Sequence, residues 1–415
     1  MDPLAAFRAL ATPEGRQAPY PLYEAIRAHG GLVPVKEGTL VAVGYRECTQ
    51  ALREPRLQVQ DGTAFDRVYP DWRDHSSVRA FTDSMLYSNP PNHARQRGAV
   101  NTEFTPQQVG RLRPVIEETI TGLLDRMAGL GAGGAEVDVM EEFATRLPIA
   151  VVGAMLGFDE ERVTWFRDLA TAIAVATDGF TNPDALATAD AAMDELAAHF
   201  GELIARKRGC PAGDIVSSLV RLHDTDPARL SHGELVGNMM LLLTAGFETT
   251  AFLTGDGALT AIRNPEYAAR LCVDDAFAER YVEEVLRVEP PVHVTSRWAA
   301  EDVTLAGTRI PAGARVVVVL AAGNRDPRRY PEPDRFDPER VNSQPLSFGG
   351  GIHFCLGAAL ARLEARIALP MLFRRFPGLA PTGEAAYRDR WVIRGLRTLP
   401  VTTGSGEPAV TRLAS

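Results

Sequence analysis

The sequence has few cysteines, and they are not grouped. Only four occur among 415 residues, Cys48, Cys210, Cys272 and Cys355, each far from the others. A structural zinc site needs ligands at close spacing, and a disulfide framework needs many cysteines in a short chain, so both are disfavoured. We therefore expect a reduced, cytoplasmic protein.

Long apolar runs and an excess of positive charge are also missing. The longest apolar stretches, residues 148–158, 239–247 and 316–322, are shorter than the roughly 20 residues that span a membrane. The first 21 residues lack the pattern of a signal peptide. A net charge of -9 argues against a nucleic-acid partner, because phosphate contacts need a basic face. With 45% hydrophobic residues the chain is globular in composition, and we expect a monomer without a membrane anchor.

The apolar spacing predicts a mainly α-helical chain with a small β part. Short helices are expected at residues 21–29 and 46–53, and strands at 32–35 and 39–43. Residues 55–90 show no period and are predicted to form a long ordered loop. Helical spacing runs from 104 to 222, with breaks at 129–134 and 179–183. A capping box at Ser231 and Glu234 begins a long helix that ends at Asn264.

The remainder of the chain is predicted to contain strands at 303–305 and 315–320, an irregular stretch at 323–350, a helix at 356–376 and a strand-rich tail. No linker interrupts the sequence, so a single domain over residues 1–415 is expected. A GxGxxG pattern at residues 129–134 matches a dinucleotide-binding fingerprint, which requires a strand before it and a helix after it. Here a helix precedes and a strand follows, so this segment is interpreted as a flexible connector.

The clearest candidate site is a glycine-rich turn, residues 348–357 (FGGGIHFCLG), that carries Cys355 to the start of a helix. Backbone N–H groups and the helix dipole at that position favour a thiolate. Glycines let the backbone approach a large flat ligand closely. These are the requirements of a cysteine that ligates haem iron. A buried structural cysteine is the alternative that a lone residue would favour.

The turn resembles the haem-binding loop of the cytochrome P450 family, whose pattern FxxGx(R/H)xCxG is matched by Phe348, Gly351, His353, Cys355 and Gly357. The resemblance implies that Cys355 is the axial ligand of the iron of haem b. It also implies that Phe348 shields the sulfur, that His353 meets a haem propionate and that Gly357 belongs to the cofactor site.

A second element of the same family is an ExxR step, Glu284 and Arg287. Residues three apart share a helix face and can form a charge-assisted hydrogen bond. Such spacing is also typical of exposed pairs worth less than about 1 kcal/mol. The resemblance implies instead a buried pair completed by Arg340, with a structural role.

The long helix carries the third element, residues 244–250 (TAGFETT), which resembles the (A/G)Gx(E/D)T motif of the family. An acid and an alcohol in an apolar run are costly unless they have partners. The resemblance implies that Ala245 lies against the haem and that Glu248 and Thr249 deliver protons. The alternative is that the Thr249 hydroxyl bonds back to the carbonyl of Ala245.

Further resemblances concern the haem propionates. Residues 89–97 (NPPNHARQR) resemble the family's DPPxHxxxR, which implies propionate contacts for His93 and Arg97, and Arg297 matches an arginine that contacts them from the other side. Two positions depart from the family: Asn89 replaces an aspartate, and Pro345 stands where many bacterial members have histidine. The remaining histidines, His29, His75, His199, His223 and His232, are predicted to lie at the surface, with His293 a possible exception.

The implied activity is monooxygenation, the hydroxylation or epoxidation of a bulky hydrophobic small molecule such as a macrolide or polyketide. Electrons would come from a ferredoxin and an NAD(P)H-dependent ferredoxin reductase, with Arg362 and Arg366 as candidate docking residues. The expected substrate pocket comprises Leu243, Phe247, Val292, His293, Val294, Thr295 and Leu396. Within the family, oxidative coupling, desaturation or peroxide-driven turnover are the alternatives. A non-catalytic haem sensor or carrier is an alternative of another class.

Overall fold

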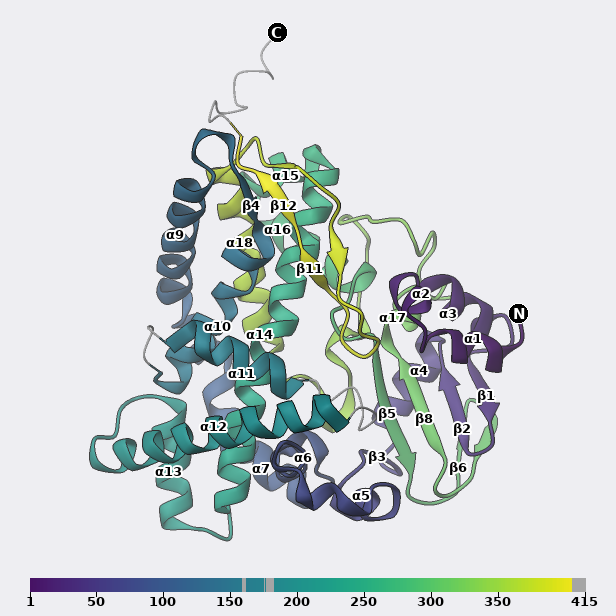
Figure 1. The fold of residues 1–415 in the computed structure, drawn as a ribbon. Coiled ribbons are helices and arrows are strands. Elements are labelled where there is room, and N and C mark those ends of the chain that lie inside the picture. The colour runs from purple at the N-terminus through teal and green to yellow at the C-terminus, as the bar shows by residue number, and fades with distance from the viewer. Residues whose placement is uncertain (159–161, 175, 177–182, 405–415) are drawn as a thin grey trace.

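Strands from both halves of the chain form one mixed sheet, seen at the right of Figure 1. The computed structural model describes residues 1–158, 162–174, 176 and 183–404. In spatial order the strands are β1 (Leu32–Lys36), β2 (Thr39–Ala42), β8 (Arg315–Val319), β5 (Val294–Ala299) and β3 (Leu57–Gln58). The β2–β8 pair is parallel, and the other pairs are antiparallel.

The alternation of side chains along β8 explains how this sheet is covered on both faces. Val317 and Val319 pack with α1 (Pro3–Ala9) and α3 (Tyr20–Arg27), and α2 (Pro13–Gln17) lies between these two helices in the chain. Val316 and Val318 point to the opposite face and pack with Cys48 of α4 (Tyr45–Arg53). Successive residues of a strand point to opposite faces, so one apolar strand serves two cores.

The predictions for the first 53 residues are confirmed within about two residues at each boundary, but the loop predicted at residues 55–90 is wrong. This segment contains β3, α5 (Gly62–Val68) and α6 (Ser76–Asp83), with short helical turns between them. Each helix is too short to show a clear period, and local contacts hold it instead. Asp190 accepts hydrogen bonds from Ser77 Oγ (2.6 Å) and lies 2.7 Å from Nδ1 of His75, which ties α6 to α12 (Pro183–Gly209).

Helices form most of the remaining chain and gather around α14 (Figure 1). The others, in chain order, are α7 (Asn92–Val100), α8 (Pro106–Gly110), α9 (Arg113–Leu130), α10 (Arg146–Leu156), α11 (Val163–Ala174), α13 (Ile215–Thr225), α14 (His232–Arg263), α15 (Pro265–Leu271), α16 (Asp275–Val288), α17 (Leu320–Gly323) and α18 (Ala358–Arg375). The predicted capping box of α14 is confirmed: Ser231 Oγ accepts from the Glu234 amide, and the Glu234 carboxylate accepts from the Ser231 amide. The break predicted at 179–183 falls mostly outside the described residues.

Within the described chain, α14 is the one helix whose length and apolar content would allow it to cross a membrane. However, 72% of its most apolar window is buried inside the protein, where α6, α10, α16 and α18 pack against it. The helix is therefore the central element of the core, and its apolar character is explained by that packing.

Short strands complete the fold. The strand β4 (Glu136–Asp138) pairs with β12 (Pro400–Thr402), which also pairs with β9 (Ala380–Pro381). Two further pairs are β6 (Val303–Leu305) with β7 (Thr308–Ile310), and β10 (Ala386–Tyr387) with β11 (Leu396–Thr398). The glycine segment at 129–134 runs from α9 to β4, as predicted, so the helix–strand order excludes the dinucleotide-binding arrangement. We call residues 386–398 the C-terminal hairpin.

Candidate functional site

The cysteine loop rests directly on the end of α4. Cys355 donates its backbone N–H to the Phe348 carbonyl (2.9 Å), which closes the turn. Gly351 has a φ of +66°, and a Cβ at this position would lie 2.3 Å from the carbonyl oxygen of Leu52. Only glycine fits such a position without moving α4. Gly351 is thus required by the packing of the loop against the protein itself.

The groups around the Cys355 thiol shift its pKa in opposite directions. Burial raises its pKa, whereas the amides of Gly357 and Ala358 and the charges of Arg97 and Arg362 lower it. The predicted help from the start of α18 is therefore present, but burial outweighs it and the pKa of the free thiol stays raised. Coordination to iron deprotonates a thiol outright. Phe348 lies beside the loop, with the Arg362 guanidinium 4.4 Å from its ring centre.

Four basic side chains converge near this loop: His93 and Arg97 from α7, Arg297 from β5, and His353 from the loop. The rings of His93 and His353 lie 4.3 Å apart, centre to centre. Burial, followed by the charges of the other three, lowers the pKa of His353 to about 3. Burial lowers the pKa of Arg297 to about 10. Within the described residues no carboxylate pairs with either arginine, and the buried Nε2 of His353 has no hydrogen-bond partner.

The structure brings Ala245 and Thr249 to the accessible side of α14. Ala245 is exposed although it lies in the middle of the core helix, and Thr249 one turn later is half-buried. The Thr249 hydroxyl donates to the Ala245 carbonyl (2.9 Å), which is the back-bonded alternative that the sequence left open. Gly246 points the other way, since a Cβ there would lie 2.8 Å from Val152 of α10. Its small size serves helix packing.

Glu248 is buried on a different face of α14 and is held by two arginines of the C-terminal hairpin. Arg388 Nη1 lies 3.3 Å from Oε1, and Arg390 Nη1 lies 2.8 Å from Oε2. The acid predicted from the TAGFETT motif thus has partners that compensate its charge, as a buried carboxylate requires. Sequence reasoning missed both arginines because they lie 140 and 142 residues away in the chain.

The ExxR pair is fully buried and fully bonded. Arg287 donates two hydrogen bonds to Glu284 (2.8 and 2.7 Å) and three to the carbonyls of Asn324, Pro333 and Arg335. All five N–H groups of the guanidinium are used. Arg340 Nε lies 3.4 Å from Glu284, as the resemblance implied. The network joins α16 to the irregular stretch that precedes the cysteine loop.

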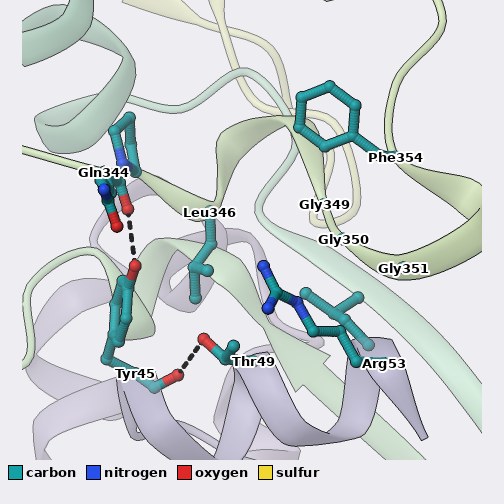
Figure 2. Close-up of a pocket in the computed structure, with 11 residues that line it drawn as sticks. Tyr45, Thr49, Arg53, Gln344, Leu346, Gly349, Gly350, Gly351 and Phe354 are labelled. Atoms are coloured by element: carbon teal, nitrogen blue, oxygen red, sulfur yellow. Dashed lines mark hydrogen bonds between the residues drawn. The ribbon is translucent and has the colours of Figure 1, made fainter.

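A hollow of about 440 Å³ lies on the outer side of the cysteine loop, between the loop and α4 (Figure 2). Tyr45, Thr49 and Arg53 of α4 face Gly349, Gly350 and Gly351 across it, and Pro345 forms part of its wall. Figure 2 shows the Arg53 side chain extending into this hollow, with its guanidinium on the side of Leu346 and Thr49. By contrast, Arg362 and Arg366 form ion pairs with Glu283 and Glu279 of α16, so both candidate docking arginines already have acidic partners.

The residues predicted to line the substrate pocket fall into two groups that differ in burial. Val292 and Thr295 are half-buried, whereas the others are packed within the protein: Leu243, Phe247, His293, Val294 and Leu396. His293 bonds to the Tyr23 hydroxyl (3.1 Å) through Nδ1, so it faces the N-terminal helices.

Among the histidines predicted at the surface, His199 is buried against the Phe166 ring, which corrects that prediction. Asn89 donates to Asp61 and bonds twice to Val59, so the departure from aspartate is accommodated locally.

These observations test whether the site fits a haem. Ala245 leaves an accessible patch on α14, and Cys355 would supply the thiolate that ligates the iron. The basic cluster of His93, Arg97, Arg297 and His353 lacks a counter-charge of its own, which two propionates would supply. The donor set therefore fits a haem-thiolate protein.

Comparison with known proteins agrees with this class. The profile of the family described as "Cytochrome P450" matches residues 276–390. Cytochrome P450 monooxygenase PikC of Streptomyces venezuelae is 40% identical over 404 residues, covering 94% of this chain and 92% of the relative. The 6-deoxyerythronolide B hydroxylase of Saccharopolyspora erythraea is 35% identical, covering 92% and 95%. The structure of the tirandamycin C-bound P450 monooxygenase TamI superposes with a TM-score of 0.83 at 35% identity, covering 95% of this chain and 99% of that chain.

The chain therefore belongs to the cytochrome P450 family and is a haem b monooxygenase. The predicted mainly α-helical P450 fold is confirmed by these structural neighbours. The roles of individual site residues are proposals, developed below.

Proposed function

We propose that the enzyme hydroxylates or epoxidises a bulky hydrophobic small molecule of the macrolide or polyketide type in the cytoplasm. The names of the relatives support this substrate class, since one acts on 6-deoxyerythronolide B and another structure holds tirandamycin C. The observation that carries the monooxygenase function within this chain is the acid–alcohol pair, Glu248 and Thr249, next to the accessible Ala245 on α14.

The residues of the site divide the work between cofactor binding and proton transfer. Cys355 would hold the haem iron through its thiolate, and the bound haem would supply the chemistry that activates O2. Arg97, Arg297, His93 and His353 would bind the propionates of the haem. Thr249 offers its hydroxyl on the accessible side of α14, and Glu248 accepts and releases the proton. A carrier or sensor has no use for this pair, so the enzymatic function is favoured.

Substitution of Thr249 by alanine tests the proton role. The hydroxyl donates to a helix carbonyl, so its removal leaves α14 intact while it removes a proton-bearing group from the accessible face. We expect Thr249→Ala to bind haem normally and to divert most of the consumed reductant into hydrogen peroxide, measured as peroxide per NAD(P)H with a surrogate ferredoxin system. Thr250→Ala, a neighbour that bonds to the Gly246 carbonyl in the same manner, is the matched control. An unchanged peroxide yield in Thr249→Ala would refute the role.

The substrate class is tested by a spin-shift titration. The half-buried Val292 and Thr295, with the exposed Ala245 of α14, are proposed to contact the ligand. We expect macrolides and polyketides to convert the haem to high spin at lower concentrations than fatty acids or terpenes of equal hydrophobicity. A stronger response to a different scaffold would contradict the macrolide assignment without affecting the monooxygenase class.

We propose an external electron donor of the ferredoxin type, served by an NAD(P)H-dependent reductase. The hollow beside the cysteine loop supports this, because Arg53 has no acidic partner among the described residues and lies on the outer side of the loop (Figure 2). Salt would weaken the binding of an acidic donor to this face, because it screens the attraction between the charges. We expect Arg53→Gln to slow reduction of the haem by ferredoxin more than Arg362→Gln does. Reduction rates that are insensitive to salt would contradict an electrostatic docking face.

A further inference from the structure

We propose that Arg315, Ser296 and Gln60 form an anchor for a carboxylate of the substrate, and we call these three residues the anchor group. They belong to β8, to β5 and to the residues that follow β3. This inference rests on the proposed function and deepens it, because it defines the substrate as a bulky hydrophobic molecule that also bears an acidic group.

Arg315 is a half-buried arginine whose guanidinium is only partly bonded within the chain. Its Nε and Nη2 donate to the Ser296 hydroxyl (3.2 and 2.8 Å), which is a neutral acceptor. Within the described residues Nη1 forms no hydrogen bond, and this atom remains accessible. Two of the five N–H groups of the guanidinium are therefore used, and an open edge remains for an acceptor from outside.

The charge of Arg315 is uncompensated in this part of the molecule. No acidic side chain of the described residues forms an ion pair with it, in contrast to the exposed Arg309, which pairs with Asp302 at 2.6 Å. Burial lowers the pKa of Arg315, and the nearby Tyr69 and Tyr87 oppose this shift without cancelling it. A partly buried cation without a counter-charge is costly. An anion that binds here would form charge-assisted hydrogen bonds and remove that cost.

The register of the sheet brings a second unsatisfied donor towards Arg315. Gln58 of β3 pairs with Trp298 of β5, which pairs with Arg315 of β8, so the three residues form one row across the sheet. Gln60 comes two residues after Gln58, and because β3 and β5 are antiparallel this direction leads towards Ser296. Nε2 of Gln60 is buried and has no hydrogen-bond partner in the described part of the chain. Buried N–H groups rarely stay unpaired, and both unsatisfied groups require an acceptor, which a carboxylate provides.

The cover of this face of the sheet ends before the anchor group. Val294, Val317 and Val319 are buried on this face, beneath the N-terminal helices. Residues two apart in a strand share a face, so Ser296 and Arg315 continue it, but both are only half-buried. The helices α1 and α3 thus leave this end of the face uncovered, and a ligand can reach the guanidinium from outside.

Aromatic side chains near the guanidinium provide an apolar wall. Tyr69 and Tyr87 interact electrostatically with Arg315. Both rings lie beside Phe65, at 6.0 and 5.8 Å between ring centres. The Trp298 ring lies on the neighbouring strand, with its centre 5.9 Å from the guanidinium carbon. A few polar groups beside an apolar wall suit a ligand with an acidic end and a hydrophobic body.

The anchor group lies at a suitable distance from a residue that we propose to contact the substrate. Val292 precedes Ser296 by four residues, and the stretch between them is extended, because it begins at a β-bridge of Val292 with Ile393 and continues as β5. At about 3.3 Å per residue, this separation is roughly 13 Å. A bulky small molecule of that length can contact Val292 with its apolar body while its carboxylate binds Arg315.

The test uses the haem-loaded enzyme and two azole probes, ω-imidazolyl dodecanoic acid and its methyl ester. The imidazole nitrogen binds the haem iron and shifts the Soret band, so a dissociation constant is measured without turnover. Imidazole alone reports whether the iron is accessible. The variants are Arg315→Gln, Arg315→Lys, Gln60→Leu and the matched control Arg309→Gln, which removes an exposed arginine from the strand β7.

The expected result is a preference for the acid that depends on Arg315. The wild type should bind the acid about tenfold more tightly than the ester, because a hydrogen bond to a charged group is gained. Arg315→Gln should abolish this preference, and Arg315→Lys should keep part of it, since an ammonium retains the charge but lacks the planar fork. Gln60→Leu should reduce the preference about threefold. Arg309→Gln should match the wild type, and every variant should bind imidazole equally well.

The outcomes distinguish a failure of this inference from a failure of the proposed function. Equal affinity of the wild type for acid and ester, or a preference that survives in Arg315→Gln, would overturn the anchor and leave the proposed monooxygenation intact. A Soret band that no probe shifts, imidazole included, would contradict an accessible haem iron and overturn both. If Arg315→Gln loses haem to a scavenger protein as readily as Arg297→Met does, the guanidinium serves the cofactor, which also contradicts the anchor.

Discussion

Two buried groups of arginines in this enzyme differ in whether they have acidic partners. Arg287, with Arg340 beside it, lies on Glu284 and on backbone carbonyls, and every N–H of Arg287 is bonded within the chain. Arg97, Arg297 and His93 lie around His353, and among the described residues no carboxylate pairs with either arginine. A buried guanidinium is costly unless its charge is compensated. The first group is therefore complete as a structural element, and the second is the group that we propose to bind the haem propionates.

The comparison shows how a structural ion pair can be told from a ligand site. Both groups contain residues that a sequence motif identifies, and both combine buried with half-buried side chains, so neither burial nor motif separates them. Satisfaction of hydrogen bonds does, because a folded protein leaves few buried polar groups unpaired. The orphaned Nε2 of His353 and the lowered pKa of Arg297, to about 10, mark the second group as the place for an external anion.

The largest effect on the stability of the fold is expected when Arg287 is removed from its ion pair with Glu284. Arg287→Met leaves Glu284 buried with one fewer partner and three carbonyls without a donor, and removal of one partner of a buried pair costs about 3–5 kcal/mol. We expect a loss of that size in the free energy of unfolding by urea. The control is Arg335→Met, an exposed arginine that pairs with Glu332. A loss of unfolding free energy below about 1 kcal/mol in Arg287→Met would contradict the structural role of the Glu284–Arg287 pair.

A second test uses a buried acid that has no hydrogen-bond partner in the part of the chain that the structure describes. Glu364 of α18 is buried, neither of its oxygens has a hydrogen-bond partner in the structure, and burial raises its pKa from 4.5 to about 8. Between these pH values the folded chain holds a proton that the unfolded chain has released. The free energy of unfolding should therefore fall as the pH rises through this window and then level off.

Substitution of Glu364 by glutamine removes that pH dependence. We expect Glu364→Gln to match the wild type near pH 5, where both side chains are neutral. At pH 9 it should be more stable, by up to about 1.4 kcal/mol for each pH unit of the window. Urea unfolding at the two pH values gives the comparison. Equal stabilities at pH 9 would mean that Glu364 has a partner that the contacts do not reveal.

A smaller effect is expected from the cofactor group, and it concerns haem retention. Arg297→Met removes one propionate partner, and a hydrogen bond to a charged group contributes about 1.5–3 kcal/mol. We therefore expect haem to transfer to a scavenger protein about 10- to 100-fold more readily, with little change in the unfolding of the apoprotein. A larger loss of apoprotein stability than of haem affinity would show that Arg297 has a structural role and would contradict its assignment to the cofactor group.

Much of this site was predictable from sequence, because its motifs are local. The capping box of α14, the loop around Cys355 and the Glu284–Arg287 step each use spacings of a few residues. The partners from distant segments were not predictable in the same way. Arg390 reaches Glu248 only because the C-terminal hairpin folds back onto α14. Likewise, the short helices within residues 55–90 depend on contacts such as His75 with Asp190, which the local sequence does not reveal.

The burial of His199 was missed for a related reason. A lone histidine without a motif is most often at the surface, but this one lies on α12 among the rings of Phe166 and Trp165 of α11. Its environment is created by the packing of two helices, so only the assembled structure shows it. The hairpin arginines and His199 thus share one cause: long-range packing decides what a side chain meets.

The claim that Cys355 is the axial ligand can be tested by one spectrum. We predict that the purified, reduced protein binds carbon monoxide with the red-shifted Soret band of haem-thiolate proteins, and that Cys355→Ala loses this band while it keeps its helical content. Retention of the red-shifted band in Cys355→Ala would contradict the account of the site.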